Sequence, residues 1–135
     1  MDKLSLAGLS TTLVHYLKDE ASEKIPIWRM ISATQADLKE RAEHWAKVLD
    51  PFGMVIPEQS KIGGGSLPGE VLPTWVVKID PNDRWRNVMD LARTLRNSNP
   101  PIVARVQDNQ LLLDPRTVLP EQDNNLLKVM SEVIR

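Results

Sequence analysis

Apolar residues recur at steps of three and four in four segments of this sequence, which predicts four amphipathic helices. The first covers about 2–18, and the second opens at Thr34, which with Asp37 resembles a capping box. The third follows Asp80, with Pro81 at its first position, and the fourth begins at Pro120. The predicted apolar faces consist of Leu6, Leu9, Leu13, Tyr16 and Leu17; of Leu38, Ala42, Trp45, Val48 and Leu49; of Trp85, Val88, Met89, Ala92 and Leu95; and of Leu126, Leu127, Met130, Val133 and Ile134.

Between these helices lie short, largely apolar segments that predict strands, at 53–56, 74–79, 102–106 and 110–113, and the first two contain β-branched residues. Asp108-Asn109 suits a two-residue turn and predicts a hairpin from the last two segments. We expect 25–28 to be a proline-stiffened linker. The resulting order, α-α-β-β-α-β-β-α, favours an α+β fold with a mainly antiparallel sheet and helices packed on it. A length of 135 residues fits a single domain, 1–135.

The composition narrows the classes of function. No cysteine is present, which excludes a thiolate nucleophile, a cysteine-ligated metal and a disulfide framework, and is compatible with a reducing cytoplasm. A net charge of −1 provides no overall field toward nucleic acid or a membrane surface, and no apolar run is long enough to span a bilayer. His15 and His44 lack neighbours at ligand spacing. We therefore expect a soluble cytoplasmic protein with no membrane partner and no metal site.

Four glycines and two prolines interrupt the pattern between positions 62 and 75. Gly63, Gly64 and Gly65 are consecutive, and Ser66 follows them. Without Cβ atoms, such a run can adopt positive φ and bring backbone N–H groups close to an anion. Its spacing matches neither a P-loop nor the dinucleotide-binding glycine motif. A flexible surface loop explains the segment equally well, so the pattern leaves both interpretations open.

Several motifs resemble the C-terminal part of the bacterial selenocysteine synthase family, also called L-seryl-tRNA(Sec) selenium transferase, and they occur in the family's order. They are the segments 63–69, 100–105 and 111–118, with further similarity at 2–7, 25–26 and 29–30. The resemblance covers essentially the whole chain. It implies the small C-terminal domain of a fold-type-I pyridoxal-phosphate enzyme, which converts seryl-tRNA to selenocysteinyl-tRNA with selenophosphate and uses the cofactor as an electron sink.

In such enzymes a large domain carries the cofactor lysine, and the small domain covers the active site. None of the eight lysines here lies in a segment that resembles the cofactor-lysine motif, and the first helix starts at once. We therefore expect the large domain to be absent, no catalytic residue and no bound pyridoxal phosphate in this chain alone, and no transferase activity without a complementing large domain. The implied partners are that large domain or protomers of the same family, in a cytoplasmic homo-oligomer.

The resemblance also implies two substrate or anion contacts. The segment Gly63, Gly64, Gly65 and Ser66 would face cofactor and substrate, although its glycines also suit a simple closure of one domain on the other. Arg105 matches the strand arginine that binds a substrate carboxylate in many fold-type-I enzymes. A seryl ester has no free carboxylate, so a contact with the terminal adenosine or selenophosphate would be needed. A structural ion pair is the alternative for Arg105, and we expect Arg116 to anchor its segment through Asp114 or a carbonyl.

Two further functions stay open from the sequence. The chain can be a free-standing interaction module descended from this domain, which binds a protein through the surface that once met the large domain. It can also be the small domain of a related pyridoxal-phosphate enzyme that acts on a small amino acid or sugar acid. A severed domain should expose an apolar patch along its first helix and near Trp28, and should self-associate or bind its large domain.

Overall fold

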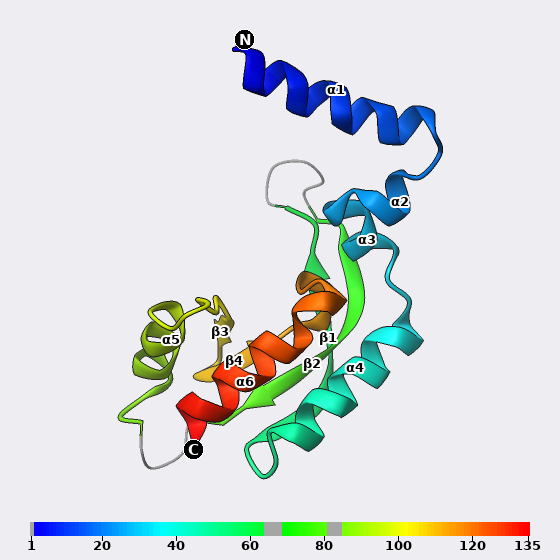
Figure 1. The fold of residues 1–135 in the computed structure, drawn as a ribbon. Helices are drawn as coiled ribbons and strands as arrows, with labels where there is room; N and C mark the ends of the chain where they lie inside the picture. Colours follow the sequence, from blue (N-terminus) through cyan, green and yellow to red (C-terminus); the bar gives the residue numbers. More distant parts are fainter. Residues whose placement is uncertain (1, 64–68, 81–84) are drawn as a thin grey trace. The chain divides into compact units, whose positions relative to one another are not determined.

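Residues 2–63, 69–80 and 85–135 are described by the computed structural model (Figure 1), and they belong to two compact units, 1–33 and 34–135. The first unit contains the helices α1 (Lys3–Leu17), α2 (Ala21–Lys24) and α3 (Pro26–Ser32). Within it, Trp28 Nε1 donates a hydrogen bond of 2.5 Å to Tyr16 Oη, and His15 Nδ1 lies 2.8 Å from Glu20 Oε1. In the described part of the chain, no helix has both the length and the apolar character needed to cross a membrane.

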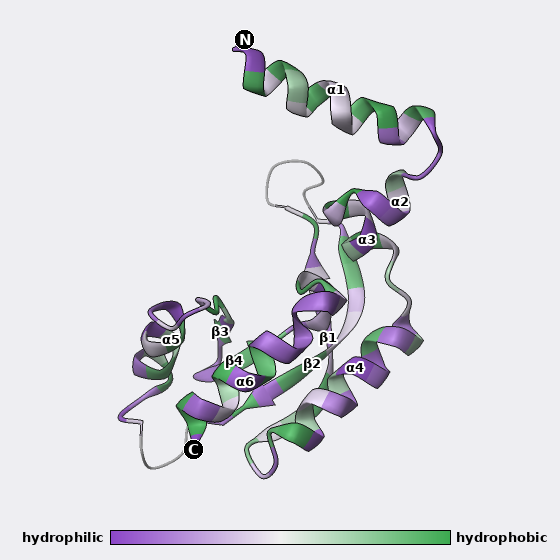
Figure 2. Ribbon diagram, viewed as in Figure 1, coloured by the Kyte–Doolittle hydropathy of each residue, from purple (hydrophilic) through white to green (hydrophobic). Residues whose placement is uncertain are grey.

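The linker predicted at 25–28 is wrong, because α3 begins there. Pro26 occupies the first helical position, where its fixed φ and missing N–H favour a helix start rather than prevent one. The predicted first helix is confirmed, but its apolar side chains, green along α1 in Figure 2, stay exposed. The large exposed apolar side chains of this unit are Leu4, Leu6, Leu9, Leu13, Val14, Tyr16, Leu17, Ile27 and Trp28.

The start of α1 should respond to acid. The Asp2 carboxylate accepts hydrogen bonds from Ser5 N at 2.8 Å and Ser5 Oγ at 3.0 Å, and these bonds lower the pKa of Asp2 below its usual range. A carboxyl group whose pKa is lower in the folded than in the unfolded state stabilises the fold at pH values above the unfolded-state pKa. This stabilisation is lost as the pH falls through the folded-state pKa. Lowering the pH from about 5 to about 2 should therefore fray the first turn of α1. Amide chemical shifts of residues 3–5 measure this.

The control is Asp2→Asn, whose amide oxygen still accepts from Ser5 N and does not titrate. We expect the same three amides to show no acid-induced step in that variant. A step of equal size in both proteins would mean that the cap of α1 does not depend on the Asp2 charge.

The second unit is built on a four-stranded sheet, with the strand order β1-β2-β4-β3 and every neighbouring pair antiparallel. Its strands are β1 (Gly53–Lys61), β2 (Val71–Ile79), β3 (Arg105–Gln107) and β4 (Gln110–Leu113). The helices are α4 (Gln35–Val48), α5 (Val88–Arg96) and α6 (Asp123–Ile134), and two short 3-10 helices, η1 (Pro115–Thr117) and η2 (Pro120–Gln122), precede α6. The predicted α+β class with an antiparallel sheet is thus confirmed.

The core lies between these helices and one face of the sheet. Alternate residues of β2 and β4 supply that face, because Val77 pairs with Leu113 and Ile79 with Leu111, and all four are buried. Trp45 of α4 is fully buried against them, as are Leu91 of α5 and Met130 of α6. In Figure 2, β2 is coloured mainly as hydrophobic, whereas the helices of this unit carry both hydrophobic and hydrophilic residues. The burial of Trp45, Ala42, Leu38 and Leu49 confirms the predicted inner face of α4.

Two predictions about the third helix differ from the structure. The helix α5 starts at Val88, later than predicted, and its cap is Asn87, whose side chain accepts from Asp90 N at 3.0 Å. Pro81 lies outside the described residues. Met89, predicted to face inward, is 52% exposed.

The remaining differences concern strand ends. The strand predicted at 102–106 is shorter, because Ile102 N donates to Leu95 O of α5 at 2.8 Å instead of to the sheet. The first strand is longer than 53–56, since β1 continues through Pro57, which an edge strand tolerates. The hairpin at Asp108-Asn109 is confirmed, and both residues have positive φ, 49° and 59°, as a type I′ turn requires.

Candidate functional site

A cavity of about 690 Å³ opens at one end of the sheet in the second unit. This volume lies within the range of about 300–1,000 Å³ that small-molecule sites occupy. Its walls come from the end of β1, the segment that leads into β3, the end of β4, η1 and the start of α6. The lining residues are Ser60, Lys61, Pro100, Pro101, Ile102, Val103, Ala104, Arg105, Gln107, Leu112, Leu113, Asp114, Thr117, Val118, Gln122, Asn125 and Leu126.

Arg105 brings a positive charge to this cavity. It is the first residue of β3, not a mid-strand residue as predicted, and it pairs opposite Leu112. Its Nη1 donates to Gln59 O at 3.0 Å, and its Nη2 lies 3.4 Å from Glu58 Oε2. Nη2 is buried and makes no hydrogen bond within the described part of the chain. The side chain is 36% exposed, and its guanidinium is held by Gln59 and Glu58 at the edge of the cavity.

Lys61 is the second cation of the cavity, and the sequence did not single it out. It is the last residue of β1 and is exposed. Arg105 reaches the carbonyl of Gln59, two residues earlier on the same strand, so both cations lie near the end of β1. Only the tertiary structure places them together, because they lie 44 positions apart in the sequence.

The carboxylate of Asp114 organises one wall of the cavity. One oxygen accepts from Ser60 Oγ, and the other accepts from Thr74 Oγ1 at 2.9 Å and from Arg116 N at 3.0 Å. Thr117 Oγ1 donates to the Asp114 carbonyl at 3.0 Å. These bonds tie the end of β4 to β1, β2 and η1, and they occupy both carboxylate oxygens. Asp114 therefore positions the wall and is not a free acid toward a ligand.

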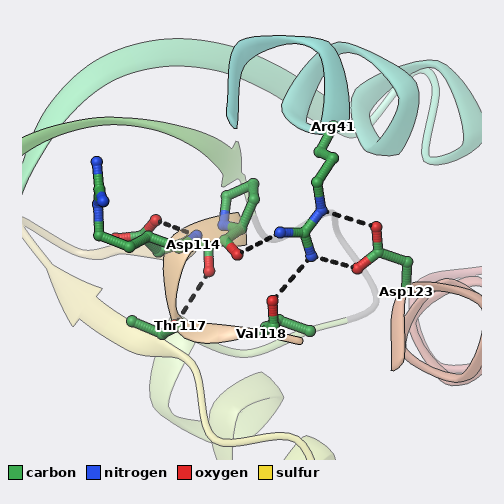
Figure 3. A network of polar contacts seen from close by, with 7 residues as sticks. Arg41, Asp114, Thr117, Val118 and Asp123 are labelled. Carbon is green, nitrogen blue, oxygen red and sulfur yellow. Dashed lines mark hydrogen bonds and ion pairs between the residues drawn. The ribbon is translucent and has the colours of Figure 1, made fainter. Parts of the chain in front are cut away.

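Arg41 holds the same wall from the side of α4 (Figure 3). Its Nη1 donates to Pro115 O at 2.8 Å and its Nη2 to Val118 O at 2.9 Å. Nε and Nη2 reach the two carboxylate oxygens of Asp123 at 3.0 and 2.5 Å. Since both side chains of this pair are 18% exposed, the bidentate pair is shielded from water and joins α4, η1 and α6.

Arg116 is buried, with 6% of its surface exposed. Burial lowers the pKa of its guanidinium, and the charge of Asp114 acts in the opposite direction. Its Nη2 donates to Pro73 O at 2.8 Å, and its backbone N donates to Asp114. These contacts with Asp114 and a carbonyl are those predicted for an anchoring role.

Most of the glycine segment, residues 63–66, lies outside the residues that the structure describes. Gly64, Gly65 and Ser66, three of the predicted contacts, lie outside the described residues. Gly63 has a positive φ of 33°, which favours glycine, and Ile62 N donates to Glu70 O at 3.4 Å across the base of the loop. Gly63 is not among the residues that line the cavity, although Lys61, two positions earlier, is. Of the two predicted contacts that the structure describes, Gly63 and Arg105, Arg105 lines the cavity.

A metal-binding site is the last type of site to consider. Within residues 2–63, 69–80 and 85–135, no group of three or more acidic or histidine side chains is arranged to hold a metal ion. The chemistry that the described residues offer is therefore that of a polar cavity with two cations, hydroxyl and amide groups, and apolar walls.

The fold and this cavity define an α+β domain with a four-stranded antiparallel sheet and a polar cavity at one end of it. Comparison with known sequences identifies the family of this chain. The chain belongs to the L-seryl-tRNA selenium transferase family, whose sequence model matches residues 1–119.

Curated relatives agree with this assignment. The chain is 40% identical over 138 residues to the L-seryl-tRNA(Sec) selenium transferase of Aquifex aeolicus, a match that covers 99% of this chain and 30% of that protein. The enzymes of that name from Alkaliphilus oremlandii and Moorella thermoacetica are 36% and 38% identical over 100% and 99% of this chain, and 30% of their own lengths. The chain thus spans about 30% of the length of these relatives.

Proposed function

We propose that this chain serves as the C-terminal small domain of an L-seryl-tRNA(Sec) selenium transferase, which acts in the cytoplasm on seryl-tRNA and selenophosphate. Membership of the family, across nearly the whole chain, carries this proposal. The domain contributes a wall of the active site through its cavity, in which Arg105 and Lys61 receive an anionic part of the substrate. We further propose Gly63, Gly64, Gly65 and Ser66, which follow Lys61 closely in the sequence, as additional substrate or anion contacts in the assembled enzyme.

Pyridoxal phosphate would serve as the electron sink for the exchange of the seryl hydroxyl, but the residues of this chain do not fit a complete site for it. All eight lysines are described, and none is buried as a cofactor lysine would be. Lys78 pairs with Asp80 at 3.5 Å, and Lys39 lies 4.9 Å from the Trp75 ring centre. The cavity carboxylate of Asp114 is already occupied by hydroxyl and amide donors. Cofactor binding is therefore assigned to the large domain.

The exposed apolar side chains of α1 and α3 support a role inside a larger assembly. Leu9, Leu13 and Tyr16 are about half exposed, although they form one stripe of α1. A stripe of this kind is stabilised when a partner covers it. We assign this surface to contact with the large domain or a protomer of a homo-oligomer, while a free-standing interaction module would use it for another protein.

A domain exchange tests the proposal. In the Aquifex aeolicus relative, the matching 30% is replaced by this chain, and selenocysteinyl-tRNA formation is measured with seryl-tRNA and selenophosphate. We expect the chimera to work within about 100-fold of the intact enzyme, a loss of no more than about 3 kcal/mol of transition-state stabilisation. The 135-residue chain alone should neither form product nor show the absorbance of bound pyridoxal phosphate.

Two results would contradict this assignment. Cofactor binding and turnover by the chain alone would show that no large domain is needed. A chimera that folds and binds pyridoxal phosphate, but forms no product, would mean that the chain is not a working small domain, and the interaction module would then become the better interpretation.

A further inference from the structure

We propose that the cavity beside Arg105 binds a nucleotide, namely the 3′-terminal adenylate of the aminoacyl-tRNA. This inference rests on the proposed function for the identity of the substrate, while the chemistry of the ligand class comes from the cavity itself. Three features of the lining support a nucleotide, and they come from different elements of the fold.

The first feature is charge. Lys61 makes no ion pair with a described residue, Arg105 is opposed by Glu58, and the negative charge of Asp114 is opposed by the guanidinium of Arg116. The cavity therefore holds about one uncompensated positive charge near the end of β1. One phosphodiester group matches that charge. Arg105 lines the cavity with a side chain that is 36% exposed, and a guanidinium forms charge-assisted hydrogen bonds with phosphate oxygens.

The second feature is an apolar lining large enough for a flat heterocycle. Pro100, Pro101 and Ile102 form one part, and Leu112, Val118 and Leu126 form another. A bare oxyanion such as phosphate fills only a small part of about 690 Å³ and makes no use of these apolar walls. A purine ring does use them, because its faces are apolar and pack against such side chains.

The third feature is a set of amide side chains suited to the edge of a base. Gln122 of η2 and Asn125 of α6 are three residues apart at the start of one helical segment and both line the cavity. Both are exposed, and neither side chain has a hydrogen-bond partner within the described residues. Asparagine and glutamine pair with adenine through its amino group and adjacent ring nitrogen. A tRNA presents an adenosine at its 3′ end, so the cavity matches the part of the substrate that carries the seryl group.

The test uses adenosine 5′-monophosphate as the probe and the 135-residue chain as the protein. Amide chemical shifts are followed during titration, and we expect saturable changes in the lining residues with a Kd on the order of 1 mM. Adenosine and inorganic phosphate should each bind at least about fivefold more weakly, because each supplies only part of the contacts. Asn125→Leu and Lys61→Met should each raise the Kd about fivefold.

The chain offers matched controls on the same helix. Asn124 and Lys128 are exposed residues of α6 that do not line the cavity. Asn124→Leu and Lys128→Met should leave the Kd unchanged. All four substituted side chains are exposed, so the variants should fold alike. Loss of binding in the controls, shifts confined to residues outside the cavity, no saturable binding, or inorganic phosphate binding as tightly as the nucleotide would each overturn the proposal.

A second measurement separates this inference from the proposed function. In the chimeric enzyme, Asn125→Leu should raise the KM for seryl-tRNA about fivefold relative to Asn124→Leu. An active chimera with equal KM values for the two variants would reject the nucleotide site and leave the proposed function in place. Nucleotide binding by the chain, with a folded but inactive chimera, would reject the proposed function and leave the nucleotide site.

Discussion

Replacing Arg41 by methionine is expected to lower the free energy of unfolding of the 34–135 unit by about 3–5 kcal/mol. The change leaves the Asp123 carboxylate, 18% exposed, without its bidentate partner, and it removes the donors to the carbonyls of Pro115 and Val118. A shielded charge and two unpaired carbonyls each cost free energy. Urea denaturation followed by tryptophan fluorescence measures the effect, because Trp45 is fully buried in the same unit.

Arg93→Met is the control for loss of an arginine. Arg93 is 71% exposed and lies 3.8 Å from Asp90, so its replacement should change stability by less than about 1 kcal/mol. The double variant Arg41→Met with Asp123→Leu should recover part of the loss, since both charges are then removed together. Equal stability of the Arg41 and Arg93 variants would show that the network in Figure 3 does not hold this wall.

Asp114→Ala should destabilise the same unit by about 3–4 kcal/mol, from the unpaired groups that it leaves. Thr74 and Ser60 are 1% and 7% exposed, so their hydroxyls lose a partner that water does not replace. The Arg116 backbone N–H loses its acceptor as well. The cavity wall formed by Ser60 and Thr117 should then loosen, and nucleotide binding should weaken along with stability. Urea denaturation and the nucleotide titration measure the two effects.

Asp114→Asn is the conservative comparison. Its amide oxygen still accepts from Thr74 and from Arg116 N, and the Ser60 hydroxyl can rotate to accept from the amide nitrogen. We expect a loss of about 1 kcal/mol. A double-mutant cycle of Asp114→Ala with Ser60→Ala should give a coupling energy above about 0.5 kcal/mol. A coupling energy near zero, or an asparagine variant as unstable as the alanine one, would contradict the assigned role of Asp114.

Much of the fold was predictable because it depends on local periodicity. The inner face of α4 and the hairpin at Asp108-Asn109 follow from helical spacing and from turn residues that accept positive φ. Errors occurred where a local signal had two meanings. Pro26 was interpreted as part of a linker but starts α3, and Asp80 was interpreted as a cap although Asn87 caps α5. Proline and acidic residues fit both loops and helix starts, so spacing alone cannot choose between them.

The site was less predictable than the fold. Arg105 was singled out by resemblance and does line the cavity, whereas Lys61 and Asn125 carried no motif and were missed. The only local signal for the Asp114 wall was the sequence Asp-Pro-Arg-Thr, in which an aspartate before a proline caps a short helix, as Asp114 caps η1. A signal of that kind indicates a turn and gives no information about a ligand.

The sequence by itself determined the α+β class, the antiparallel hairpin, the main helices and the family, because these depend on periodicity and on motifs that are continuous along the chain. Only the tertiary structure decided which side chains meet. Asp114 joins Ser60 and Thr74, and Arg41 joins Asp123, through contacts that span 40 to 82 positions. The physical reason is that strand order and helix packing, not spacing in the sequence, set distances across the sheet, and a cavity with two cations exists only where those distances are short.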